Sequence, residues 1–112
     1  MTETWAKAMS GDRQVVIVSD NLLDRARIEE TARAAGWEPV PWSSESDKAD
    51  LAVVDLQSEK AEAAIGALAV HSRVVAFGSH VDTDALAAAE GLGADALPRS
   101  RFFARLEELF VV

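Results

Sequence analysis

The chain has 112 residues, of which 49% are hydrophobic, and its formal net charge is −8. This length suits one domain with an apolar core, and the absence of cysteine excludes a disulfide scaffold and thiolate metal sites. The acidic balance argues against general binding to nucleic acids, because their phosphates attract clustered lysine and arginine. No apolar run approaches the ~18 residues that span a bilayer, and residues 1–13 lack the apolar stretch of a signal peptide. We therefore expect a cytoplasmic domain that binds neither nucleic acid nor membrane.

The first half of the chain predicts a loose arm followed by a strand and a helix. Residues 1–13 have no periodic pattern and are predicted to form a flexible arm ahead of a single domain at residues 14–112. The β-branched run at 14–18 is typical of a strand covered on both faces. The next three residues favour caps and turns. A helix then follows from the spacing of its apolar and small positions, before Gly36 ends it: Leu22, Leu23, Ala26, Ile28, Ala32 and Ala35.

The middle of the chain predicts an edge strand and a central strand with little between them. Residues 37–42 contain Pro39 and Pro41, which cannot donate to a strand ladder, so an edge position is expected. The polar residues 43–50 are too few for a confident helix, and a helix at this point is predicted to be shortened or missing. Residues 51–55 form the second apolar run, which ends on the carboxylate of Asp55.

The second half of the chain repeats the alternation of strand and helix. Ser58 is predicted to cap a helix that runs to about Val70, and a strand follows at 73–77. Asp82 or Thr83 is predicted to cap the next helix, ahead of a weak strand at 94–98. A last helix at 101–110 carries an apolar side with five large residues: Phe102, Phe103, Leu106, Leu109 and Phe110.

Five alternations of strand and helix predict a doubly wound α/β fold with a five-stranded parallel sheet of the flavodoxin-like kind. In such a fold ligands gather at the carboxyl ends of the strands. The residues that follow the apolar runs are therefore expected to share one edge of the sheet: Ser19, Asp20, Asn21, Asp55, Gly78, Ser79 and His80.

The segments DLAVVDL and GLGADALPRSRF, in this order and spacing, resemble the receiver domain of bacterial two-component response regulators from about Gln14 to Leu109. The resemblance implies that Asp55 holds the phosphoacceptor position and that Asp20 and Asp55 are ligands of Mg²⁺. It also implies that the Ser79 hydroxyl contacts the phosphoryl group. An aspartate can accept a phosphoryl group as a nucleophile, and Mg²⁺ prefers oxygen ligands.

The sequence also departs from the receiver pattern. Ser19 stands where the family has a second acid beside Asp20, and the turn after Asp55 lacks the usual Met-Pro. The position of the family's lysine falls at Ser100, with Arg99 and Arg101 on either side, and arginine does not reproduce the compact geometry of an ammonium group. These departures predict weak Mg²⁺ binding or none.

The leading interpretation is an atypical, stand-alone receiver-like domain that is not an enzyme and acts by binding another protein. The alternative is a receiver that is phosphorylated on Asp55 with Mg²⁺, and a weaker alternative is a sensor of small anions or nucleotides. The predicted interface comprises Arg99, Arg101, Phe103 and Arg105, for a signalling protein such as a histidine kinase or for self-association. The other interpretation of this segment is ordinary solvated charge, with Phe103 buried against the preceding strand.

Overall fold

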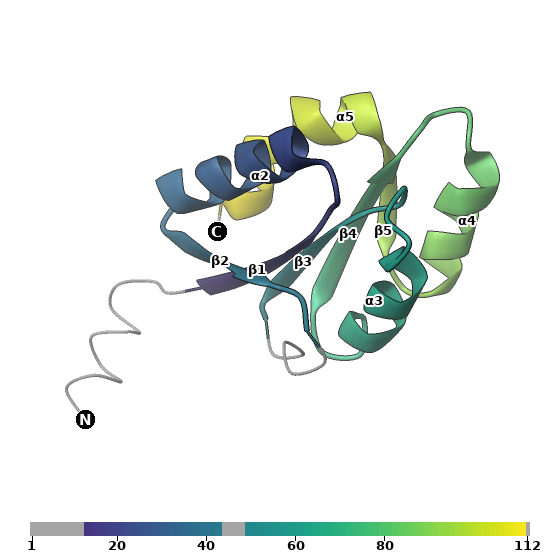
Figure 1. Ribbon diagram of the computed structural model, residues 1–112, viewed down its shortest axis with the longest axis horizontal. Helices are drawn as coiled ribbons and strands as arrows, with labels where there is room; N and C mark the ends of the chain where they lie inside the picture. Colours follow the sequence, from purple (N-terminus) through teal and green to yellow (C-terminus); the bar gives the residue numbers. More distant parts are fainter. Residues whose placement is uncertain (1–12, 44–48, 112) are drawn as a thin grey trace.

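A computed structural model describes residues 13–43 and 49–111 (Figure 1). A single sheet holds five parallel strands in the order β2-β1-β3-β4-β5. The strands are β1 (Arg13–Val18), β2 (Trp37–Pro41), β3 (Leu51–Asp55), β4 (Arg73–Gly78) and β5 (Asp95–Pro98). The helices are α2 (Leu22–Ala34), α3 (Ala61–Leu68), α4 (Thr83–Gly91) and α5 (Arg99–Ala104), with a 3₁₀ helix η1 (Leu106–Phe110) at the end.

This topology confirms the predicted doubly wound fold. All four strand pairs are parallel, so every connection crosses from one end of the sheet to the other. The strand that contains Pro39 and Pro41 lies at the edge, as predicted, because proline has no backbone N–H to donate to a second neighbouring strand. Arg13 belongs to β1, while residues 1–12 of the predicted arm lie outside the described residues.

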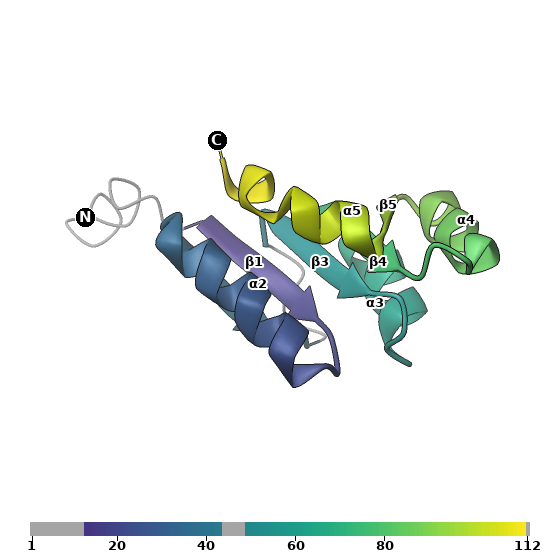
Figure 2. The same ribbon diagram turned by 90° about the horizontal axis from the view of Figure 1, so that it is seen from above.

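Helices cover both faces of the sheet (Figures 1 and 2). Helices α2 and α5 lie with η1 on one face, and α3 and α4 lie on the other. Alternate residues of a strand point to opposite faces, so Val15 and Ile17 pack under α2 while Val16 and Val18 pack under α3 and α4. The continuous apolar runs in the sequence follow from this double coverage.

The predicted apolar face of α2 was wrong at most of its positions. Leu22 and Leu23 are 76% and 83% exposed, and Ala26 and Ala35 are exposed as well. The buried stripe consists instead of Asp24, Ile28 and Ala32, at the i, i+4, i+8 spacing of one helix face. A carboxylate therefore takes the first position of this stripe, at the end of α2 that faces the carboxyl edge of the sheet.

The predicted final helix is divided in two. Helix α5 ends at Ala104, and after Arg105 the backbone winds as the 3₁₀ helix η1. Phe102, Leu106 and Phe110 are buried as predicted, while Phe103 and Leu109 are half-buried. The Phe110 carbonyl accepts a hydrogen bond from Trp37 Nε1 at 3.1 Å, which ties η1 to the edge strand.

The remaining boundaries follow the sequence with small differences. Asp82 caps α4 as predicted, since its carboxylate accepts from the backbone N–H of Ala85. Ser58 accepts instead from the N–H of Lys60, one turn before α3 begins. Between β2 and β3, the described residues 42, 43, 49 and 50 are not helical, and the rest of the expected loop at 44–48 lies outside the described residues. None of the helices in the described ranges is long and apolar enough to cross a membrane.

Candidate functional site at the carboxyl edge

The carboxyl ends of β1, β3, β4 and β5 surround a hollow of about 390 Å³. The structure brings together most of the residues that the sequence placed at this edge. The hollow is lined by Asn21, Asp55, Gln57, Phe77, Gly78, Ser79, His80, Arg99 and Ser100. Asp20 is not part of this lining, and its side chain is exposed on the turn after β1.

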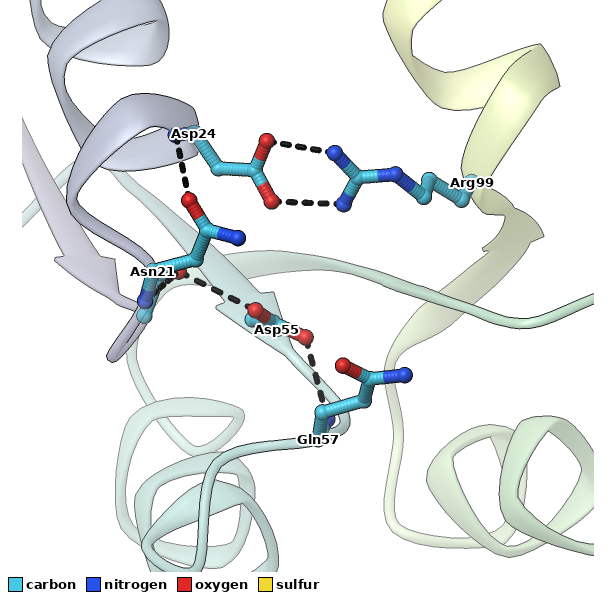
Figure 3. A network of polar contacts seen from close by, with 6 residues as sticks. Asn21, Asp24, Asp55, Gln57 and Arg99 are labelled. Carbon is cyan, nitrogen blue, oxygen red and sulfur yellow. Dashed lines mark hydrogen bonds and ion pairs between the residues drawn. The ribbon is translucent and has the colours of Figure 1, made fainter.

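Asp55 is the buried carboxylate of this site, with only 5% of its surface exposed. Its Oδ2 accepts a hydrogen bond from the Ser19 hydroxyl at 3.0 Å, and its Oδ1 accepts from the backbone N–H of Gln57 at 3.0 Å (Figure 3). The Ser19 oxygen in turn accepts from the N–H of Asn21 at 3.2 Å. Both oxygens of Asp55 thus already have a donor from the chain itself, and Ser19 contacts the carboxylate as a neutral donor.

The donor set for a magnesium ion is poor at this edge. Asp55 is the one carboxylate among the residues that line the hollow, and both of its oxygens accept hydrogen bonds. In residues 13–43 and 49–111 no three or more Asp, Glu or His side chains gather in one place. The described residues of the hollow therefore offer Mg²⁺ a single carboxylate that is already hydrogen-bonded, and they fit the ion poorly.

The shortest ion pair among the described residues joins Asp24 of α2 to Arg99, the first residue of α5. Nη1 and Nη2 of Arg99 each donate to one oxygen of the Asp24 carboxylate, which makes the pair bidentate (Figure 3). The Asp24 side chain is 9% exposed, whereas that of Arg99 is 50% exposed. The carboxylate is thus nearly withdrawn from water, and the guanidinium is its compensating charge.

The pKa values of Asp24 and Arg99 both shift because the two side chains are paired. Hydrogen bonding to Arg99 lowers the pKa of Asp24 below its ordinary value of 3.8, although burial acts in the opposite direction. Hydrogen bonding to Asp24 raises the pKa of Arg99, and the charge of Asp55 adds to that rise. Arg99 therefore remains a cation that is paired with Asp24 and is also attracted by the negative charge of Asp55.

Sequence reasoning identified Arg99 but missed Asp24. The spacing of Asp24 could have identified it as a buried residue. Asp24 lies four residues before Ile28 and eight before Ala32, on the same apolar stripe of the helix. Its partner could not be identified in this way, because Arg99 lies 75 residues further along the chain.

The guanidinium of Arg99 also packs against the aromatic rings of Phe77 and Phe103. Arg99 lies 4.8 Å from the ring centroid of Phe103 and 5.9 Å from that of Phe77. The guanidinium of Arg27 lies 4.6 Å from the same Phe103 ring. Phe103 also makes edge-to-face contacts with Phe77 and Phe102, at 5.4 and 4.9 Å between centroids. The ring is therefore shared between the core and a charged surface.

The other predicted site residues have fewer contacts. Ser79 lines the hollow, and its oxygen accepts from the N–H of Val81 at 3.3 Å. Ser100 also lines the hollow, where the receiver resemblance puts a lysine. Arg101 and Arg105 are exposed, and neither makes an ion pair with another residue that the structure describes.

Comparisons with known proteins find similarity in structure but not in sequence. No protein-family model and no curated protein matches the chain. A response regulator from Thermotoga maritima superposes with a TM-score of 0.66 at 16% identity, over 88% of this chain and 98% of that one. A response regulator from Hahella chejuensis gives 0.67 at 20% identity, over 88% and 92%. A response regulator receiver domain protein from Methanospirillum hungatei JF-1 gives 0.69 at 13% identity, over 88% and 94%. The chain therefore has the fold of a receiver domain.

Proposed function

We propose that this chain is a receiver-type signalling domain that acts by binding another protein and is not phosphorylated on Asp55. The proposal is supported by the receiver fold, which the chain shares with proteins described as response regulators. The observation that carries it is the state of the site, where Asp55 and Arg99 are both bound by other residues of the chain.

The hydrogen bonds of Asp55 oppose its use as a nucleophile. Donation from Ser19 and Gln57 stabilises the charged carboxylate, and esterification of one oxygen would weaken the hydrogen bond that this oxygen accepts, because the negative charge is lost. A transferred phosphoryl group also needs cations around its oxygens. Arg99 is the cation in the described lining of the hollow, and its guanidinium is already paired with Asp24.

Small phosphodonors are expected to leave the protein unmodified. After incubation with acetyl phosphate or phosphoramidate and Mg²⁺, intact-mass spectrometry should show the mass of the untreated chain. The nucleophile is engaged, and Arg99, the cation in the described lining of the hollow, is paired with Asp24. A receiver domain that does accept these donors serves as the positive control. A mass increase of one phosphoryl group that is absent in Asp55→Asn would instead establish the alternative, a functional phosphoacceptor.

Mg²⁺ is expected to bind weakly. In calorimetric titration the wild-type chain should not saturate below ~1 mM Mg²⁺, since Asp55 is the one carboxylate in the lining of the hollow. Ser19→Asp should bind more tightly, because it replaces a hydroxyl that contacts Asp55 by a second carboxylate. Ser100→Asp is the matched control, since it adds the same charge to the hollow at another position. Tight binding by the wild type would show that the donor set is sufficient.

The sensor of small anions has less support from this geometry. An anion in the hollow would meet the charge of Asp55, and Arg99 could receive it only by sharing its charge with Asp24. The predicted interface for a signalling partner, such as a histidine kinase, remains a proposal for Arg99, Arg101, Phe103 and Arg105. Arg101 and Arg105 are its most accessible members, since Arg99 is paired and Phe103 is half-buried.

A further inference from the structure

Asp55 is a buried carboxylate with no cation bound to it in the part of the chain that the structure describes. The residue is 5% exposed, and no ion pair within residues 13–43 and 49–111 includes it. Its two donors, the Ser19 hydroxyl and the backbone N–H of Gln57, are both neutral. A carboxylate withdrawn from water generally needs an opposite charge as well as hydrogen bonds. The negative charge of Asp55 is therefore not balanced by contact with a described cation.

Arg99 does not supply this balance. Both of its terminal nitrogens donate to Asp24, so the guanidinium attracts Asp55 from a distance without forming an ion pair with it. The charges of Asp24 and Arg99 are opposite, and the pair adds no net charge to this edge of the sheet. With His80 counted as neutral, the site keeps the single negative charge of Asp55. A cation that enters the hollow is attracted by this charge, and an anion is repelled.

Neutral hydrogen-bond acceptors surround the carboxylate. Asn21 and Gln57 lie on either side of Asp55 (Figure 3), and the hydroxyls of Ser79 and Ser100 line the same hollow. Amide and hydroxyl oxygens accept hydrogen bonds. Each oxygen of Asp55 has room for a second donor, because a carboxylate oxygen has two lone pairs and one hydrogen bond reaches each of them here. The hollow thus combines one negative charge with several neutral acceptors.

A primary ammonium group matches this combination. It carries one positive charge and three N–H donors, and it accepts no hydrogen bond. One donor can reach Asp55 while the others reach neutral oxygens. Mg²⁺ is less suited, because it requires a near-octahedral set of oxygen ligands and loses its water reluctantly. The hollow of about 390 Å³ lies in the usual size range of ligand pockets, roughly 300 to 1,000 Å³, and Phe77 offers an apolar surface to the methylenes of an alkyl chain.

We propose that the carboxyl-edge hollow binds a lysine side chain of another protein, with its ammonium group paired to Asp55. The net charge of −8 favours the approach of a basic segment, because opposite charges steer association. Asp20 is exposed on the turn beside Asn21 and strengthens the negative potential at the rim. The inference rests on the proposed function, since it gives the unmodified Asp55 a role in protein binding. It names the chemical group of the partner that the site would recognise.

Titration of the 112-residue chain with Nα-acetyl-lysine methylamide tests the site. Heteronuclear NMR at about pH 8, where the lysine ammonium is still protonated, follows the backbone N–H groups of Asn21 and Gln57. Their signals should shift and saturate with a Kd of about 1 to 10 mM, as expected for a ligand with one charged contact. The amide with an acetylated Nε is the matched ligand control. It has lost the charge and should cause no saturable shift in these signals.

Two variants of the same chemistry locate the binding. Asp55→Asn keeps the shape of the side chain but removes its charge, and it should weaken lysine binding by at least roughly tenfold. Asp84→Asn is the matched control, because Asp84 is exposed on α4 and does not line the hollow. Its binding should equal that of the wild type. Thermal melting establishes that each variant is folded, and the acetylated ligand keeps the test valid even if Asp55→Asn does not fold.

Three outcomes overturn the proposal: no saturation with the lysine ligand, equal binding of the acetylated ligand, or equal losses in Asp55→Asn and Asp84→Asn. A free amine as the natural ligand is a further outcome against it. In that case butylammonium or a polyamine would bind more tightly than the lysine ligand with its peptide groups. The titration contains neither Mg²⁺ nor a phosphodonor, so it is independent of the phosphodonor test. Phosphorylation in that test contradicts the proposed function, whereas absence of lysine binding contradicts only this inference.

Discussion

Replacing Arg99 by alanine is expected to lower the free energy of unfolding by about 2 to 3 kcal/mol. The variant leaves the Asp24 carboxylate nearly buried, at 9% exposure, without its bidentate partner. Removing one member of a buried pair generally costs about 3 to 5 kcal/mol. The half-exposed guanidinium of Arg99 reduces that figure, because water already screens one side of the pair. Urea unfolding near neutral pH measures the difference.

Two variants provide the controls for this result. Arg101→Ala removes an exposed arginine of the same helix that has no ion pair with a described residue, and it should change stability by less than about 0.5 kcal/mol. Asp24→Leu combined with Arg99→Leu removes both charges, and it should be closer to the wild type than Arg99→Ala is. Equal effects of Arg99→Ala and Arg101→Ala would mean that the pair contributes nothing to stability.

The contribution of Asp24 is expected to disappear in acid. The pKa of Asp24 is lowered in the folded state, so its contribution is fully present above the ordinary value of 3.8. It is lost as the pH falls through the lower folded value, where the native carboxylate is finally protonated. Arg99 stays charged throughout this range, because its pKa is raised. The stability difference between the wild type and Asp24→Asn should therefore be constant from neutral pH to about pH 5 and shrink below about pH 4.

Phe102→Ala is expected to have the largest effect of any single change considered, about 3 to 5 kcal/mol. Phe102 is 1% exposed, and its ring stacks on Phe77 with 4.5 Å between centroids. The truncation would leave a cavity between α5 and β4 that the close packing of the interior cannot fill. Thermal and urea unfolding of the variant measure this loss.

Phe103→Ala is the matched comparison one residue away. Its ring is half-buried and contacts Phe77 and Phe102 by its edge, so its removal should cost about 1 to 2 kcal/mol. A folded Phe103→Ala would allow the interface role of this residue to be measured apart from its role in the core. A loss as large as that of Phe102→Ala would place Phe103 in the core and remove it from the proposed interface.

The sheet was predictable from the sequence because its strands have a strong local signal. The runs at 15–18, 51–54 and 74–77 are apolar without interruption, as is typical of parallel strands covered on both faces. The convergence of Asn21, Asp55 and Ser79 on one hollow follows from parallel direction alone. These inferences depend on no contact between distant side chains.

The parts that sequence reasoning missed depend on such contacts. Leu22 and Leu23 were placed on the buried face of α2 because they are apolar, but the face is set by Ile28 and Ala32 and begins with Asp24. A buried aspartate is interpreted as a surface residue until its partner is known. That partner is Arg99, whose position in space is fixed only by the complete sheet.

The contacts of Trp37 with Phe110 and of Asp24 with Arg99 have a consequence for the order of folding. They join residues 73 and 75 positions apart, so each closes about two thirds of the 112-residue chain into a loop. During synthesis the ribosome must release the segment from Arg99 to Phe110 before either contact can form. Before that release, the ring of Phe102 cannot pack against Ile17 and Phe77 on this face of the sheet. Because such long-range contacts form late, the face of the sheet that α2 covers is the part of the nascent chain that stays exposed to solvent longest.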